Sequence, residues 1–123
     1  MTKRVLDVGN CVPDHAAIRG LIERSFDAQV AQAHDLAGAV AELQKQPADL
    51  VLVNRKLDLD YSDGMAVVRH LKADPQWSAT PVMLITNFPE YQVEAVNSGA
   101  EPGFGKQELR TNETLEKLRK YLA

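Results

Sequence analysis

The sequence has few of the residues that build covalent or metal-held scaffolds. Among 123 residues there is a single cysteine, Cys11. One cysteine excludes an internal disulfide and a zinc site built from cysteines, and it fits the reducing cytoplasm, where we expect the protein to be. No apolar run approaches the roughly 18 residues that a membrane span needs, so we expect no membrane contact.

A concentration of positive charge is also missing. The formal net charge is −3, and the 14 Lys and Arg residues are scattered along the chain. A nucleic-acid-binding surface would gather them in a stripe or patch, so we expect no direct binding of nucleic acid. The N-terminal segment has no signal-peptide character, because Asp7 falls where an apolar stretch would be needed. Secretion is therefore not expected.

The remaining composition is that of an ordinary globular domain, with 45% hydrophobic and 25% charged residues. We predict a single domain over residues 1–123. Short apolar runs predict strands near residues 5–8, 29–33, 49–53, 81–85 and 102–104. Amphipathic stretches between and after them predict helices, and three of these have good capping residues: Asp14, Asp35, and Thr111 or Asn112.

A strand followed by a helix, repeated five times, implies an α/β fold with a parallel sheet and helices on both faces. Asp49–Val53 is continuously apolar, which is typical of a strand buried on both faces. In such sheets the functional site lies beyond the carboxyl ends of the strands. The residues just after the predicted strands include Gly9, Asn10, Asn54, Thr86 and Lys106.

Over nearly its whole length the chain resembles the receiver domain of bacterial response regulators. The resemblance rests on four segments in order: Lys3–Val8, Asp49–Val53, Asp74–Thr86, and Gly99–Ala100 followed by Lys106. It implies a CheY-like, flavodoxin-like three-layer α/β/α fold with a five-stranded parallel sheet of order 2-1-3-4-5. It also implies a place in two-component signalling or a phosphorelay.

In that family an aspartate after the third strand accepts a phosphoryl group, and acidic residues after the first strand hold magnesium. A hydroxyl and a lysine contact the phosphoryl oxygens, and this chain keeps both, as Thr86 and Lys106. The acceptor position carries Asn54, and the acidic positions carry Gly9 and Asn10. A neutral amide forms no acyl phosphate, and magnesium prefers carboxylate oxygens. We predict a degenerate acceptor pocket made of these five residues, with no catalytic residue, no cofactor and no magnesium binding.

Two further departures concern the family's conformational switch. Gln107 follows Lys106 where the family has a proline joined by a cis bond. We expect a trans bond here, because a cis bond before another residue type costs about 2.5–4 kcal/mol. The family's aromatic switch position aligns with Gly103, and Phe104 comes one residue later. One step along a strand reverses a side chain's direction, so the usual coupling between hydroxyl and aromatic ring is not expected.

These observations predict a pseudo-receiver that binds a protein partner, either a signalling protein or a separate effector, without phosphorylation. The resemblance places the partner face at Tyr91, Phe104, Leu115 and Tyr121. A homodimer is left open. The alternative is a sensor that binds a small molecule in the degenerate pocket. We expect no enzyme, because Gly9–Pro13 lacks the glycines of a phosphate loop and no nucleophile lies beside a base.

Some polar residues have more than one interpretation. A carboxylate within a buried strand is costly unless it is paired, so Asp7 should either meet a basic side chain or have a raised pKa. Lys106 is expected to bond Asn54 or a loop carbonyl, with anion binding as the alternative. The acidic loop is interpreted as solvated, with a weak calcium site as the alternative; it carries Asp58, Asp60 and Asp63.

The remaining candidates are interpreted mainly as structural residues. Cys11 is expected to be a buried, inert thiol, with redox activity as the alternative. Trp77 is either a partner anchor or a cover over the core edge, and Val93 is either part of the partner face or packed in the core. The three histidines share no spacing typical of metal ligands: His15, His34 and His70.

Overall fold

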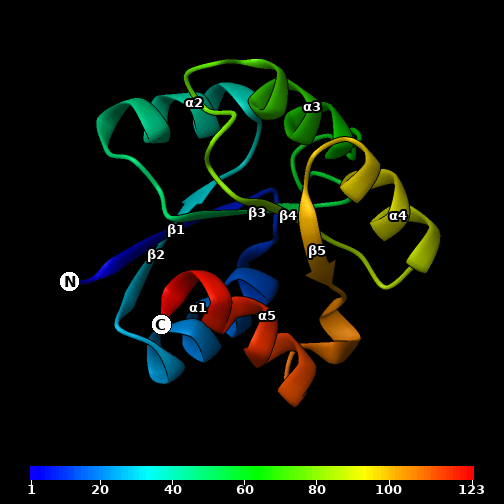
Figure 1. Ribbon diagram of the computed structural model, residues 1–123. Helices are drawn as coiled ribbons and strands as arrows, with labels where there is room; N and C mark the ends of the chain where they lie inside the picture. The colour runs from blue at the N-terminus through cyan, green and yellow to red at the C-terminus, as the bar shows by residue number, and fades with distance from the viewer.

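The apolar runs form the central sheet of a three-layer structure, described here for residues 1–123 by a computed structural model (Figure 1). The strands are β1 (Lys3–Val8), β2 (Ala28–Ala33), β3 (Leu50–Asn54), β4 (Val82–Ile85) and β5 (Glu101–Phe104). All neighbouring strands are parallel, and their order is β2-β1-β3-β4-β5. The predicted fold class and strand order are therefore confirmed.

Five α-helices cover the two faces of this sheet. They are α1 (Val12–Ser25), α2 (Leu36–Lys45), α3 (Met65–Ala73), α4 (Pro89–Asn97) and α5 (Asn112–Leu122). Helices α1 and α5 pack on one face, and α2, α3 and α4 pack on the other (Figure 1). None of the five combines the length and the apolar character that a membrane crossing requires.

The position of β3 between two helical layers explains why its sequence is continuously apolar. Leu50 and Leu52 belong to the core beneath α1 and α5, whereas Val51 and Val53 belong to the core beneath α2, α3 and α4. All four side chains are fully buried. Successive side chains of a strand point to opposite faces, so a strand between two helical layers needs apolar residues at every position. Asn54 ends this run at the carboxyl edge of the sheet.

The caps of the helices agree with the prediction at two of three positions. The side chain of Asp35 accepts a hydrogen bond from the Gly38 N–H at 2.8 Å, and Thr111 accepts one from the Thr114 N–H at 3.3 Å. The prediction for Asp14 is wrong, because α1 begins at Val12 with Pro13 in its first turn. Proline is favoured there, since it needs no hydrogen bond to its nitrogen and its φ suits the helix.

Strand β5 is irregular. Met83 pairs with Glu101 but Ile85 pairs with Phe104, so one extra residue bulges out of β5. A short 3-10 turn, η1 (Lys106–Glu108), follows this strand. The peptide bond between Lys106 and Gln107 is trans, as predicted, because the chain contains no cis bond. Of the two interpretations of Trp77, the cover over the core edge is confirmed, because Trp77 is buried among the α2, α3 and α4 side chains.

Candidate functional site

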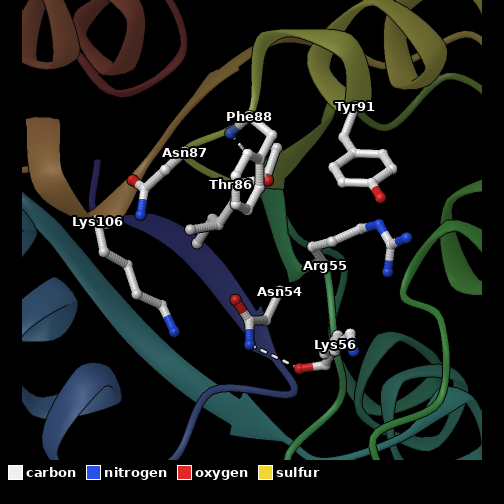
Figure 2. A pocket seen from close by; sticks show the side chains of 9 residues that line it. Asn54, Arg55, Lys56, Thr86, Asn87, Phe88, Tyr91 and Lys106 are labelled. Carbon is white, nitrogen blue, oxygen red and sulfur yellow. Dashed lines mark hydrogen bonds between the residues drawn. The ribbon is translucent and has the colours of Figure 1, made fainter.

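A cavity of about 410 Å³ opens at the carboxyl ends of the central strands (Figure 2). Its walls come from the end of β3 and the loop after it, the end of β4 and the loop after it, the first turn of α4, and the start of η1. This is where a parallel α/β sheet is expected to hold its functional site. The lining residues are Asn54, Arg55, Lys56, Ile85, Thr86, Asn87, Phe88, Tyr91 and Lys106.

The cavity brings together three of the five residues of the predicted acceptor pocket. Asn54, Thr86 and Lys106 line it, and Figure 2 shows them arranged around its opening. Gly9 and Asn10 do not line it. Gly9 lies behind Asn54, and Asn10 is fully buried with its side chain turned toward the sheet.

The Asn54 amide holds the end of β3 to its surroundings. Its Nδ2 donates to the carbonyl oxygen of Lys56 at 2.6 Å and to that of Gly9 at 3.4 Å. Its own carbonyl oxygen points toward the cavity (Figure 2). An aspartate at this position has no N–H to donate and would face those two carbonyl oxygens with a negative charge. The amide therefore has a structural role that a carboxylate cannot fill.

Lys106 forms an ion pair that the sequence analysis missed. Its Nζ donates to Oδ2 of Asp14 at 2.7 Å, so the predicted bond to Asn54 or a loop carbonyl is wrong. This hydrogen bond is the main reason that the pKa of the Asp14 carboxyl lies below its ordinary value. The available signal was the position of Asp14, because the first turn of a helix after β1 lies over the carboxyl edge of the sheet.

Cys11 is exposed, and its Sγ donates to Oδ2 of Asp14 at 3.3 Å. The predicted buried thiol is therefore wrong. The error has the same origin as the misplaced cap, because Cys11 lies at the N-cap position of α1, outside the core.

Asp7 is the centre of a buried polar cluster. Its side chain is fully buried and accepts hydrogen bonds from Asn10 Nδ2 at 2.6 Å and His15 Nδ1 at 2.7 Å. Burial raises the pKa of the Asp7 carboxyl, although both hydrogen bonds oppose that shift. The predicted pairing with a basic side chain and the raised pKa are both found. The backbone carbonyl oxygen of Asn10 also accepts a bond from Gln32 Nε2 at 3.0 Å, so this cluster fixes the β1–α1 connection.

The donor set around the cavity does not fit the magnesium ion that the resemblance implies. Magnesium sites in proteins use carboxylates, and no carboxylate lines the cavity. No three His, Cys, Asp or Glu side chains come together anywhere in the chain. The Asp7 and Asp14 carboxylates are already bound, Asp7 within the buried cluster and Asp14 to Lys106.

The backbone at Gly9 opposes an acidic side chain at that position. Gly9 has a φ of +81°, in the region that glycine adopts at little cost and other residues rarely adopt. A Cβ built there would collide with the Cδ2 atom of Leu57, which is itself buried. The local backbone conformation therefore favours glycine over an acidic residue at position 9.

The Gln92 side chain ties α4 to the two neighbouring strands, β4 and β5. This α4 side chain donates to the Leu84 carbonyl at 2.9 Å and accepts from the Gly103 N–H at 2.9 Å. Phe104 is buried in the core formed with α1 and α5, on the other face of the sheet. Its inclusion in the partner face is therefore wrong. The one-residue step along β5 directs its ring away from Thr86, as the strand geometry predicts.

The other partner-face candidates are half-buried. Tyr91 lies beneath the Arg55 guanidinium, which is 4.1 Å from its ring centre. Leu115 and Tyr121 pack against the α1 and α5 core. The large apolar side chains that α4 and its N-cap expose are Phe88, Val93 and Val96, with exposed fractions of 58%, 59% and 41%. Of the two interpretations of Val93, packing in the core is wrong, because this side chain is exposed on the outer side of α4.

Each carboxylate of the acidic loop has a local protein partner. Asp58 lies 3.0 Å from His34 Nδ1. Asp60 accepts from the Ser62 N–H, and Asp63 accepts from the Met65 N–H at the start of α3. The loop is thus organised by turns and caps. His70 is exposed on α3 and has no ion pair.

The comparisons with known proteins agree with this architecture. A family model described as the response regulator receiver domain matches residues 10–119. No curated protein sequence matches the chain significantly.

Several solved structures share the fold. A putative response regulator from Chloroflexus aurantiacus has a TM-score of 0.85 at 14% identity, with 98% of each chain covered. The chemotaxis protein CheY4 from Vibrio cholerae has a TM-score of 0.78 at 22% identity, with 99% of this chain and 100% of that one covered. NtrX from Brucella abortus has a TM-score of 0.76 at 24% identity, and there the match covers 98% of this chain but only 29% of that one.

Proposed function

Because the chain belongs to the response regulator receiver domain family of two-component signalling, we propose that it is a pseudo-receiver that binds a protein partner without being phosphorylated. The observation that carries this proposal is the state of the acceptor position. Asn54 is a neutral amide whose nitrogen is committed to two backbone carbonyls, and the amide oxygen that faces the cavity is too weak a nucleophile to form an acyl phosphate.

The electrostatics around Asn54 support the same proposal. Phosphoryl transfer relies on positioning and on neutralising charge around a bound metal. The cavity lining offers no carboxylate for a metal, and the Gly9 backbone opposes an acid at that position. The Lys106 ammonium is bound to Asp14. A receiver with this site would keep one surface and would not alternate between two forms.

The surface proposed for the partner is the exposed side of α4. Phe88, Val93 and Val96 expose apolar side chains there, and exposed apolar area is typical of protein contacts. The Gln92 hydrogen bonds tie this helix to β4 and β5. A partner would therefore meet a surface whose position does not depend on the acceptor site.

The phosphorylation half of the proposal is tested with magnesium and acetyl phosphate. We expect no phosphoryl mass increase in the intact protein, and no NMR shifts around Asn54 on addition of beryllofluoride. The mass spectra should be taken in mild acid, because acyl phosphates are labile to base. A receiver with an aspartate acceptor serves as the positive control. A stoichiometric mass increase that survives acid and disappears in base would refute the proposal.

The Asn54→Asp variant makes this test sharper. It supplies the missing nucleophile alone, and we expect it to remain unphosphorylated because the magnesium ligands are still absent. We also expect a loss of about 1 kcal/mol or more in the free energy of unfolding, since the variant loses two hydrogen bonds to carbonyls. Intact mass and urea unfolding measure the two effects.

The binding half is tested by capturing partners from the native cell with and without acetyl phosphate and magnesium. We expect the same partner under both conditions, its loss with Val93→Glu, and its retention with Val12→Glu. The matched control changes another exposed valine, since Val12 has an exposed fraction of 77% and lies at the start of α1. Capture that required the phosphoryl donor would contradict the proposal.

A further inference from the structure

The cavity has an unbalanced charge. Three cationic side chains line it, Arg55, Lys56 and Lys106, and no acidic side chain does. Lys56 forms no ion pair, whereas Arg55 lies 3.5 Å from Asp63 and Lys106 lies 2.7 Å from Asp14. A concave surface lined by charges of one sign concentrates ions of the other sign. Lys56 is therefore the cation most free to meet an anion.

Several hydrogen-bond donors around the cavity are also free. The N–H groups of Lys56 and Asn87 donate to no protein atom. Lys56 faces Asp63 in an isolated antiparallel bridge whose hydrogen bonds run through the neighbouring residues, so its N–H points away from Asp63. The Thr86 hydroxyl accepts from the Phe88 N–H at 3.2 Å and donates to no protein group.

Arg55 adds a second kind of evidence. Its Nε is buried and has no hydrogen-bond partner, although buried polar atoms are nearly always satisfied. Its guanidinium lies against the Tyr91 ring at one wall of the cavity (Figure 2). Arg55 therefore adds a positive charge to this wall of the cavity, and its only ionic contact there is the 3.5 Å one with Asp63.

The size of the cavity indicates what the ligand carries besides its charge. A volume of about 410 Å³ lies within the range of roughly 300–1,000 Å³ found for small-molecule sites. Ile85, Phe88 and Tyr91 form an apolar part of the cavity wall, and Phe88 is 58% exposed. A bare inorganic ion would leave this wall without a contact.

We infer that the cavity binds a small organic oxyanion without a metal ion. Its carboxylate or phosphate group lies against Lys56, Thr86 and Asn87, and its apolar body lies against Phe88. This goes beyond binding of a protein partner, and it is independent of whether the chain is phosphorylated. Lys106 can join the site only by leaving Asp14, so that ion pair competes with the ligand.

The test is an NMR titration of the uniformly ¹⁵N-labelled protein in EDTA at constant ionic strength. The probes are inorganic phosphate, phenyl phosphate, benzoate and phenol. We expect saturable shifts of the Lys56 and Asn87 amides with phenyl phosphate or benzoate, and none with phenol. Burying the ring should make phenyl phosphate bind about tenfold more tightly than inorganic phosphate. The comparison of phenyl phosphate with benzoate identifies which oxyanion the site prefers.

Matched variants separate a site from general attraction to a charged surface. Lys56→Gln should weaken the better probe about tenfold, since it removes a charge-assisted hydrogen bond, and Asp14→Asn should strengthen it by releasing Lys106. Lys45→Gln should change nothing, because this lysine ends α2 at the opposite edge of the sheet. The inference fails if no oxyanion gives saturable shifts, if binding needs magnesium, or if Lys45→Gln weakens binding as much as Lys56→Gln.

Discussion

Replacing His15 with alanine is expected to lower the free energy of unfolding by about 3 kcal/mol at neutral pH. The replacement removes the imidazole that bonds the Asp7 carboxyl at 2.7 Å. Asp7 is fully buried, so no water reaches it to replace the lost partner. An uncompensated buried charge is among the most destabilising defects that a single substitution creates.

The pH dependence of this loss follows from the direction of the Asp7 shift. Its pKa in the folded protein is raised above the ordinary value of an aspartate. The carboxyl therefore contributes its full stability below the unfolded pKa, and that contribution is lost as the pH rises through the folded pKa. Removing His15 raises the folded pKa further, so the variant should lose much more stability at pH 7 than below about pH 4, where Asp7 is protonated in both states.

Urea unfolding at both pH values measures the effect. His70→Ala is the control, because His70 is an exposed histidine on α3 without an ion pair. The double variant Asp7→Asn with His15→Ala should recover most of the loss, since it removes the charge together with its partner. Equal losses at pH 4 and pH 7 for His15→Ala would show that packing, and not the charge of Asp7, is responsible.

Replacing Gly9 with aspartate is expected to lower the free energy of unfolding by about 2–3 kcal/mol. The backbone there has a φ of +81°, and a Cβ would collide with Leu57. The substitution restores an acid at a position where the family holds magnesium, yet the backbone must shift to admit it. We therefore expect neither metal binding nor phosphorylation, even in combination with Asn54→Asp.

Two alanine variants show whether the backbone causes the loss. Gly9→Ala should be nearly as destabilising as Gly9→Asp, because the conformation and the collision are the same. Gly20→Ala should be neutral or stabilising, since Gly20 lies in α1, its Cβ would meet only the movable end of the Arg24 side chain, and alanine favours a helix. A Gly9→Asp protein as stable as the parent that bound magnesium would contradict the steric explanation.

The sequence predicted the sheet well because periodicity and burial act locally. The continuous apolar runs of β3 and β4 follow from the burial of both faces of the sheet, and the strand-helix order leaves few topologies. Contacts between distant residues were harder to predict. Lys106 and Asp14 lie 92 positions apart, and the only signal for their contact was the position of Asp14 just after β1. The interpretation of Asp14 as a helix cap hid this contact.

Only part of the candidate site was predicted, namely the residues whose place follows from the strand pattern. Asn54, Thr86 and Lys106 follow strands, so their position at the carboxyl edge could be predicted. Arg55 and Lys56 were missed, although two basic residues directly after Asn54 gave a usable signal. The exposure of Val93 could not be predicted from a helix as short as α4, where apolar residues occur on both its inner and its outer side.

The bulge of β5 has a consequence for how copies of this protein can meet. Strand β5 forms one border of the sheet, and such a border can be extended by a strand from another molecule. Here Pro102 has no N–H to donate, and Gly103 donates its own to Gln92. The extra residue also interrupts the straight row of backbone groups that a new strand would need. Growth of a continuous sheet from copy to copy is therefore disfavoured at this border, and a stable pair of copies formed on this side of the molecule should meet through helix surfaces.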